Sequence, residues 1–106
     1  MPRQLKPEER DLIAFILGHG SNLPAQDSLV EEMNDGGMGS VRFVGTQDRR
    51  FGRRIGSAEF TDADGTLVSV ALNLDQHGEL FELDIWKVDF SPLQRIAPIS
   101  ELRISN

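Results

Sequence analysis

Glu59, Glu82 and Asp84 are carboxylates whose positions in the chain predict one shared, acidic surface. They fall on predicted strands, where side chains two residues apart point to the same face of the sheet. The small residues Ser69 and Ala71 lie on the strand between them, so the surface should be shallow at its centre. Carboxylates grouped in this way can form a catalytic pair, bind a metal ion or attract a cationic partner.

The surrounding residues do not complete a catalytic or metal site. The chain has no cysteine, and neither of its two histidines falls in the acidic cluster, so no thiolate nucleophile or zinc site is predicted. His77 lies beside Asp75 in a predicted turn, but a Ser-His-Asp arrangement needs a spatial match that the sequence does not identify. Residues 62–65 resemble the start of a calcium loop and lack its distal glutamate. We therefore predict no catalytic residue, no metal and no cofactor.

Trp86 continues the line of Glu82 and Asp84 along their strand. Between residues 84 and 90, apolar side chains occur at both odd and even positions, which indicates that both sides of this strand are covered. The C-terminal residues 96–104 are one expected cover, and a homodimer interface, where tryptophan is a common anchor, is the alternative. The residues predicted to bind a partner are Glu59, Glu82, Asp84 and Trp86. The competing interpretation is the solvated face of an antiparallel sheet.

The chain is acidic outside one segment. Its formal net charge is −6, and because nucleic-acid binding needs a basic footprint, nucleic acid is not an expected partner. Five arginines nevertheless fall within 42–54, opposed there only by Asp48: Arg42, Arg49, Arg50, Arg53 and Arg54. This segment is interpreted as a solvated loop before a strand or, alternatively, as a contact for an anion or phosphate.

The turn Asp62-Ala63-Asp64-Gly65 predicts the register of the first hairpin. Gly65 suits the left-handed position that closes a three-residue loop with a bulge. A two-residue turn would move one strand by one residue and exchange its faces, so the hydrophobic pattern selects the longer loop. The predicted pairs are Phe60 with Val68, Ala58 with Val70 and Gly56 with Leu72.

A second turn, at 75–78, requires an even-length loop to keep apolar residues opposite one another. Either Gln76-His77 or His77-Gly78 is central, and both choices give the same faces. The two turns together predict one apolar core face, made of Ala58, Phe60, Val68, Val70, Leu72, Phe81, Leu83 and Ile85.

Two helices are predicted ahead of these strands. Pro7 suits the first helical position and the following glutamates complement the positive end of the helix dipole, so the first helix opens at 6–10 and ends at 18–20. A second helix is predicted to start between Pro24 and Asp27 and to stop by Gly36. The predicted strands cover about 40–45, 53–61, 66–75 and 79–90, followed by a short last strand or a packed tail.

These elements predict an α+β fold in a single domain over residues 1–106. Two N-terminal helices pack on one face of a four- to five-stranded, mostly antiparallel sheet with the strand order of a β-meander. No stretch approaches the roughly 18 apolar residues of a membrane-spanning helix, and the N-terminus does not resemble a signal peptide. We expect no contact with a membrane and, since the chain lacks cysteine, a location in the cytoplasm.

Two segments, 32–40 (EMNDGGMGS) and 81–93 (FELDIWKVDFSPL), resemble a family of small, uncharacterised bacterial proteins. The resemblance extends from the first helix to Pro92. It implies membership and a bacterial source but no particular activity, since none is established for that family.

The function expected from these observations is a non-enzymatic protein-interaction or binding module with an acidic sheet face. Its partner would be a cationic protein or a second copy of the chain. The alternative is a small-ligand-binding protein or an enzyme that uses the face of Glu59, Glu82 and Asp84, and a deep pocket with converging carboxylates would favour this alternative.

Overall fold

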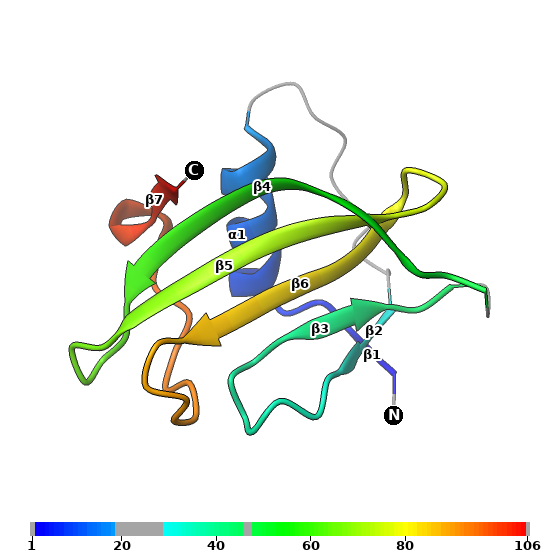
Figure 1. The fold of residues 1–106 in the computed structure, drawn as a ribbon. Coiled ribbons are helices and arrows are strands. Elements are labelled where there is room, and N and C mark those ends of the chain that lie inside the picture. Colours follow the sequence, from blue (N-terminus) through cyan, green and yellow to red (C-terminus); the bar gives the residue numbers. More distant parts are fainter. Residues whose placement is uncertain (1, 19–28, 46–47, 106) are drawn as a thin grey trace.

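A single sheet of seven strands runs through the part of the chain that the computed structural model describes, residues 2–18, 29–45 and 48–105 (Figure 1). The strands are β1 Arg3–Gln4, β2 Leu29–Glu32, β3 Val41–Phe43, β4 Phe51–Thr61, β5 Leu67–Asp75, β6 Leu80–Lys87 and β7 Arg103–Ser105. Their order across the sheet is β1-β2-β3-β6-β5-β4-β7, and each neighbouring pair is antiparallel. One α-helix, α1 (Pro7–Leu17), packs on one face.

The predicted architecture of two helices on a four- to five-stranded sheet is therefore wrong. The described residues hold one α-helix, and the meander of β4, β5 and β6 is extended on both sides by short strands. These strands are two to four residues long. β3 falls within the strand predicted at about 40–45, and β7 is the predicted short last strand. β1 and β2 were not predicted, because segments so short carry too little alternation for a strand signal, which needs about four to eight residues.

The first hairpin has the predicted register. Phe60 lies opposite Val68, Ala58 opposite Val70 and Gly56 opposite Leu72. Gly65 adopts a φ of 85°, and its amide donates to the carbonyl of Asp62 at 2.9 Å. A residue with a Cβ is strained at this φ, so the glycine fixes the loop that sets the register.

In the second hairpin the residue pairs face the predicted sides of the sheet, but the loop differs from the prediction. Leu72 lies opposite Leu83 and Val70 opposite Ile85, but the predicted even-length loop is wrong. The amide of Asp75 donates to the carbonyl of Glu79 at 2.8 Å across a three-residue loop, and an irregularity beside Asn73 and Leu74 restores the register.

Phe81 is the residue that this irregularity leaves without an opposite partner on β5. It is buried but does not belong to the main core cluster. Its ring instead lies beneath the guanidinium groups of Arg42 and Arg49, at 4.9 and 5.5 Å from their central carbons. The prediction that Phe81 belongs to the core face is wrong, because a bulge changes the direction of the side chain that it displaces.

Helix α1 begins at Pro7 and ends before Gly18, as predicted. Leu12 and Ile13 are fully buried against the sheet. Close packing of α1 on β4 depends on Gly56, because a Cβ there would lie 2.6 Å from the Cγ2 of Ile16.

The predicted second helix is a strand where the structure describes it. Residues 24–28 lie outside the described residues, and Leu29–Glu32 form β2. Only Val30 of this strand is buried, and it lies opposite Phe43 on β3 and Arg3 on β1. Pairing with β3 satisfies backbone groups that would otherwise be exposed on an edge, and this tertiary gain outweighs the helix propensity of Glu31 and Glu32.

The C-terminal segment crosses the helix-covered face and returns to the sheet as β7, so a short last strand is confirmed. A 3₁₀ turn, η1 (Ile99–Glu101), precedes β7. Ala97 and Leu102 are buried in the core cluster, and Ile104 lies opposite Ala58 on β4.

Lys87, the last residue of β6, is fully buried on the core side of the sheet. Its Nζ lies 2.8 Å from a carboxylate oxygen of Asp62 and 2.7 Å from one of Asp64, and it donates to the carbonyl of Pro92 at 3.2 Å. Asp62 also accepts hydrogen bonds from the amides of Ala63 (2.7 Å), Gln94 (3.0 Å) and Arg95 (3.2 Å).

This network favours the ionised form of Asp62. Burial alone would raise the pKa of its carboxyl group, but hydrogen bonds from Lys87 and from the amides of Gln94 and Ala63 outweigh burial and lower the pKa. The same carboxylates raise the pKa of Lys87. The pair is therefore charged on both sides over the ordinary pH range, and it joins the turn of the first hairpin to the C-terminal segment.

Truncation of the core at Leu83 should be costly. Leu83 is fully buried opposite Leu72, and Leu83→Ala should lower the free energy of unfolding by about 2–5 kcal/mol, because it leaves a cavity. Chemical denaturation measures this change. Leu29→Ala is the matched control: Leu29 is 45% exposed and its truncation should cost no more than about 0.5 kcal/mol. Equal effects of the two variants would show that the core is assigned wrongly.

Removal of Lys87 should destabilise the protein through the carboxylates that it leaves behind. We expect Lys87→Met to lower the midpoint of thermal unfolding by about 10–20 °C, since Asp62 then remains buried without its cation. Adding Asp62→Asn removes that orphaned charge while keeping an oxygen for the amides. The double variant should therefore unfold at a higher temperature than Lys87→Met alone, and a lower temperature would mean that the two residues are not coupled.

Candidate functional site

The face of the sheet opposite α1, called the outer face below, carries all four residues predicted to bind a partner. Residues directly opposite in neighbouring strands share a face, and Glu59, Ser69 and Trp86 form one row across β4, β5 and β6. Asp84 lies opposite Ala71 in the next row, and Glu82 lies opposite Asn73 in the row after that. The predicted alignment of these side chains is thus present, with small side chains between them.

Two of the three carboxylates are already engaged by arginines. Glu59 lies 3.3 Å from the Nε of Arg103 on β7, and Glu82 lies 3.3 Å from an Nη of Arg42 on β3. Glu82 also accepts a hydrogen bond from the side-chain amide of Asn73 at 3.1 Å. The outer face therefore carries ion pairs between acidic and basic side chains and is not uniformly acidic.

Asp84 is the exception among the three. It is exposed, and its carboxylate lies 3.2 Å from the hydroxyl of the buried Ser40. That hydroxyl also lies 3.1 Å from the carbonyl of Ile85 and accepts the amide of Ile85 at 2.7 Å. Ser40 thus fixes β3 against β6 and offers no free nucleophile, while Asp84 keeps its charge in contact with solvent.

Trp86 is 46% exposed in the single chain, so the prediction that the C-terminal residues cover it is wrong. Those residues pack on the opposite face and on the β4 edge. A cover supplied by a second subunit stays a prediction.

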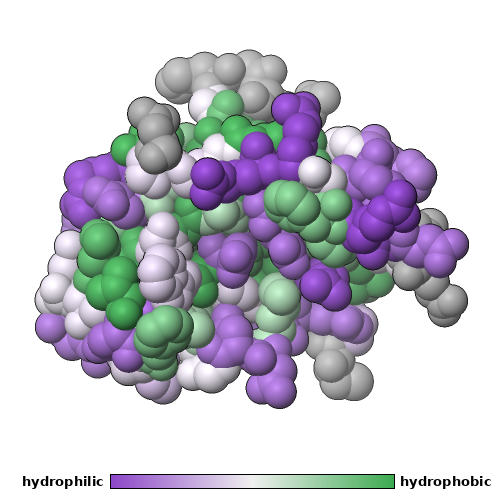
Figure 2. Space-filling view, in the orientation of Figure 1, coloured by the Kyte–Doolittle hydropathy of each residue, from purple (hydrophilic) through white to green (hydrophobic). Residues whose placement is uncertain are grey.

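Trp86 belongs to a group of exposed apolar side chains, which we call the Trp86 patch: Leu67, Trp86, Val88 and Phe90. The rings of Trp86 and Phe90 are 5.9 Å apart between centroids. Figure 2 shows apolar residues gathered on one side of the outer face, next to a hydrophilic region. Trp86 and Val88 alternate along one strand and so share a face. Leu67 lies beside them on the neighbouring strand, where its carbonyl accepts the amide of Val88 at 3.0 Å. Phe90 reaches Trp86 through the turn that follows β6.

Phe90 is held in an unusual conformation. Its φ is 62°, and it is the only residue other than glycine with a positive φ among those described. This region costs a residue with a bulky side chain roughly 1–3 kcal/mol. The amide of Phe90 donates to the carbonyl of Lys87 at 2.8 Å, and the carboxylate of Asp89 accepts the amide of Ser91 at 3.0 Å. These bonds maintain a turn that leaves Phe90 68% exposed.

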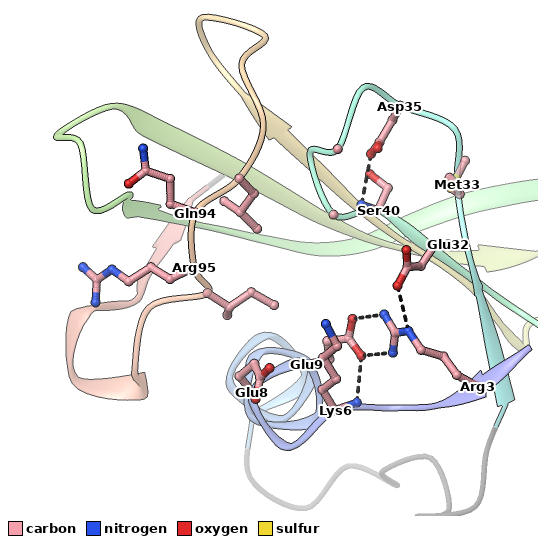
Figure 3. A pocket seen from close by; sticks show the side chains of 14 residues that line it. Arg3, Lys6, Glu8, Glu9, Glu32, Met33, Asp35, Ser40, Gln94 and Arg95 are labelled. Atoms are coloured by element: carbon pink, nitrogen blue, oxygen red, sulfur yellow. Dashed lines mark hydrogen bonds and ion pairs between the residues drawn. The ribbon is translucent and has the colours of Figure 1, made fainter.

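A groove of about 320 Å³ lies on the other side of the molecule, between the start of α1, the end of β2 and the chain around Leu93 (Figure 3). Arg3 binds the buried carboxylate of Glu9 through two hydrogen bonds of 2.8 Å and reaches Glu32 at 3.0 Å. Glu9 in turn accepts the amide of Lys6 at 2.8 Å and so caps the helix. These charged groups bind one another, and Gln94 points away from them. The groove is therefore best explained as a structural junction.

Arg49 in the basic segment has a structural role that the sequence did not reveal. Its Nε lies 2.9 Å from the buried carboxylate of Asp75, and its guanidinium donates to the carbonyls of Phe43 (2.8 Å) and Leu80. It therefore ties the loop before β4 to β3 and to the second hairpin. Arg50, Arg53 and Arg54 are exposed and are considered below.

Metal-binding geometry is not found among the described residues. No group of three or more histidine and carboxylate side chains within them is placed to hold a metal ion. His77 is exposed in the second turn, where its backbone amide donates to Asp75 at 2.8 Å. His19 lies outside the described part of the chain.

The family to which the chain belongs is a domain of unknown function (DUF6984), whose model matches residues 2–97. No curated protein is significantly similar to the chain. No solved structure is significantly similar to it either. In the described residues, no helix is both long and apolar enough to cross a membrane.

The Arg49–Asp75 pair predicts a loss of stability in acid. Burial would raise the pKa of Asp75, but hydrogen bonds from the amide of Glu79, from Arg49 and from the amide of His77 prevail and lower the pKa to about 2. A lowered carboxyl pKa stabilises the folded state above the unfolded pKa of about 3.9, and this contribution is lost as the pH falls toward 2.

Urea denaturation between pH 2 and pH 7 tests this expectation. The free energy of unfolding should decrease below about pH 4, and Asp75→Asn should flatten that decrease while lowering stability at pH 7. Asp48→Asn, a change at an exposed carboxylate, is the control and should follow the wild-type profile. Identical slopes for wild type and Asp75→Asn would remove Asp75 as the cause.

Proposed function

We propose that this chain is a non-enzymatic protein-interaction module that binds a cationic partner through the Trp86 patch and the adjacent carboxylate of Asp84. One observation carries the proposal: an exposed tryptophan and a strained, exposed phenylalanine form a contiguous apolar surface beside a carboxylate that has no cationic partner among the described residues. Aromatic side chains are enriched at the centres of protein interfaces. Strained backbone conformations, such as that of Phe90, cluster at functional sites.

The charge around the patch favours a cationic partner over a second copy of the chain. Asp84 and Asp89 are both exposed beside it, and Lys87, the only cation between residues 80 and 92, is fully buried. A symmetric dimer through this patch would bring the same carboxylates of both copies together, which is unfavourable. A basic partner with an apolar side chain would meet both features of the surface.

The same charges argue for binding rather than acid–base chemistry. Arg103 and Arg42 each form an ion pair with one carboxylate at the edges of the face, with Glu59 and Glu82 respectively. Asp84 lies in the open row between them, opposite Ala71. A shared proton between two carboxylates would need a closer and more enclosed pair.

Affinity capture from native lysate with four immobilised proteins tests the proposal. Wild type and Asp11→Lys should retain the same basic protein, since Asp11 is exposed on α1, on the opposite face of the sheet from the patch. Asp84→Lys and Trp86→Ala should each reduce its retention, by about tenfold in affinity once the partner is purified. Asp84 is a better target than Glu82 because reversal at Glu82 would place a lysine against Arg42.

Trp86 is the only tryptophan of the chain, so its fluorescence reports directly on the patch. Binding of the purified partner should shift the emission of wild type and Asp11→Lys to shorter wavelength, because the indole leaves water. Binding should also weaken as salt is added, since exposed charges are screened. Equal retention by Asp84→Lys and wild type, or a partner that leaves the emission unchanged, would refute this assignment of the surface.

A further inference from the structure

The outer edge of β4 is only partly paired. β4 spans Phe51–Thr61, but its edge neighbour β7 pairs with Ser57–Glu59 alone. No described strand pairs with residues 51–56 on that side, while the other side of β4 is occupied by β5 (Figure 1). Such an edge presents backbone amides and carbonyls that can accept another extended chain.

Three arginines with no described partner line this open edge. Arg50, Arg53 and Arg54 are exposed, and their side chains make no ion pair or hydrogen bond with the residues that the structure describes. The other two arginines of the basic segment are engaged, Arg42 with Glu82 and Arg49 with Asp75. The segment 50–54 is thus a concentration of unneutralised positive charge in a chain whose net charge is −6.

A hollow of about 340 Å³ opens where β7 stops. It is lined by Ile16 of α1, by Arg54 and Ile55 of β4, and by Ile104 of β7. Ile104 is 56% exposed, and Ile55 is only partly buried against the core. The hollow can receive one apolar side chain of a chain that lies along the edge.

We propose that the open edge of β4, residues 51–56, binds an extended, acidic segment of another protein by strand addition. The backbone of the segment would continue the sheet beyond β7, its carboxylates would pair with Arg50, Arg53 and Arg54, and an apolar residue would enter the hollow beside Ile55. This site is separate from the Trp86 patch, which lies on the outer face and binds the opposite charge.

The positive charge of this edge disfavours a second copy of the chain as the occupant. Two copies pairing edge to edge would place the arginines of one copy against those of the other, and like charges across neighbouring strands are destabilising. An acidic strand removes the repulsion, so charge complementarity determines the occupant.

A peptide of alternating glutamate and valine, eight residues long and blocked at both ends, is the probe. In a ¹H–¹⁵N correlation spectrum of the full chain, it should shift the amide signals of residues 51–56 and 104–105 and leave the indole signal of Trp86 unchanged. Arg53→Glu combined with Arg54→Glu should weaken binding by about tenfold or more. Lys6→Glu, a reversal of an exposed cation far from this edge, should bind as wild type does.

A second peptide separates strand addition from simple charge attraction. It has the same sequence, but alternate backbone nitrogens are methylated, which removes the donors of one edge while the charge is kept. Strand addition predicts that this peptide binds about tenfold or more weakly than the first. Equal binding of the two peptides, or shifts spread over the surface instead of residues 51–56, would overturn the proposal. Because Asp84→Lys leaves this edge intact, failure here is distinguishable from failure at the Trp86 patch.

Discussion

Lys87 and Asp62 form the contact on which the arrangement of the chain depends. Lys87 ends β6, Asp62 opens the turn between β4 and β5, and Asp62 also accepts the amides of Gln94 and Arg95 in the C-terminal segment. Because both side chains are fully shielded from water, neither tolerates loss of the other. The pair therefore holds the C-terminal segment against the sheet end. It also fixes the position from which the chain turns through Val88 to Phe90, so that the aromatic patch on the outer face is supported by a charge pair on the opposite side.

The strands β3 to β7 could be predicted from the sequence, whereas β1 and β2 could not, for a physical reason. In β4, β5 and β6 the alternation of apolar residues and the conformational demand of Gly65 give the same register, so local and tertiary preferences agree. In β2 they disagree. Its glutamates favour a helix, while Val30 pairs with residues far away in the sequence. Likewise, Phe81 satisfies the alternation and still leaves the core, because an irregularity in β6 and the guanidinium groups above it decide its direction.

The composition of the outer face was predictable, but its charge was not. Glu59, Glu82, Asp84 and Trp86 align because their strand parity fixes their direction. Whether a carboxylate on this face is free depends on β3 and β7, which bring Arg42 and Arg103 from outside the meander. The sequence contains those arginines without indicating their partners. Sequence reasoning therefore overestimated the acidity of the face and also missed Leu67 and Phe90, which reach Trp86 through a turn and a neighbouring strand.

The contacts of each arginine indicate its role better than its position in the sequence does. Arg3, Arg42, Arg49 and Arg103 each contact a carboxylate from another strand or from α1, so they join elements of the sheet. Arg50, Arg53 and Arg54 contact no carboxylate among the described residues, although the chain carries an excess of acidic residues. Within the described part of the chain, these three cations lie near an open strand edge and form no ion pair that would join elements of the sheet. They are exposed, as Asp84 is beside Trp86, so one sheet carries exposed charges of opposite sign at two separate places.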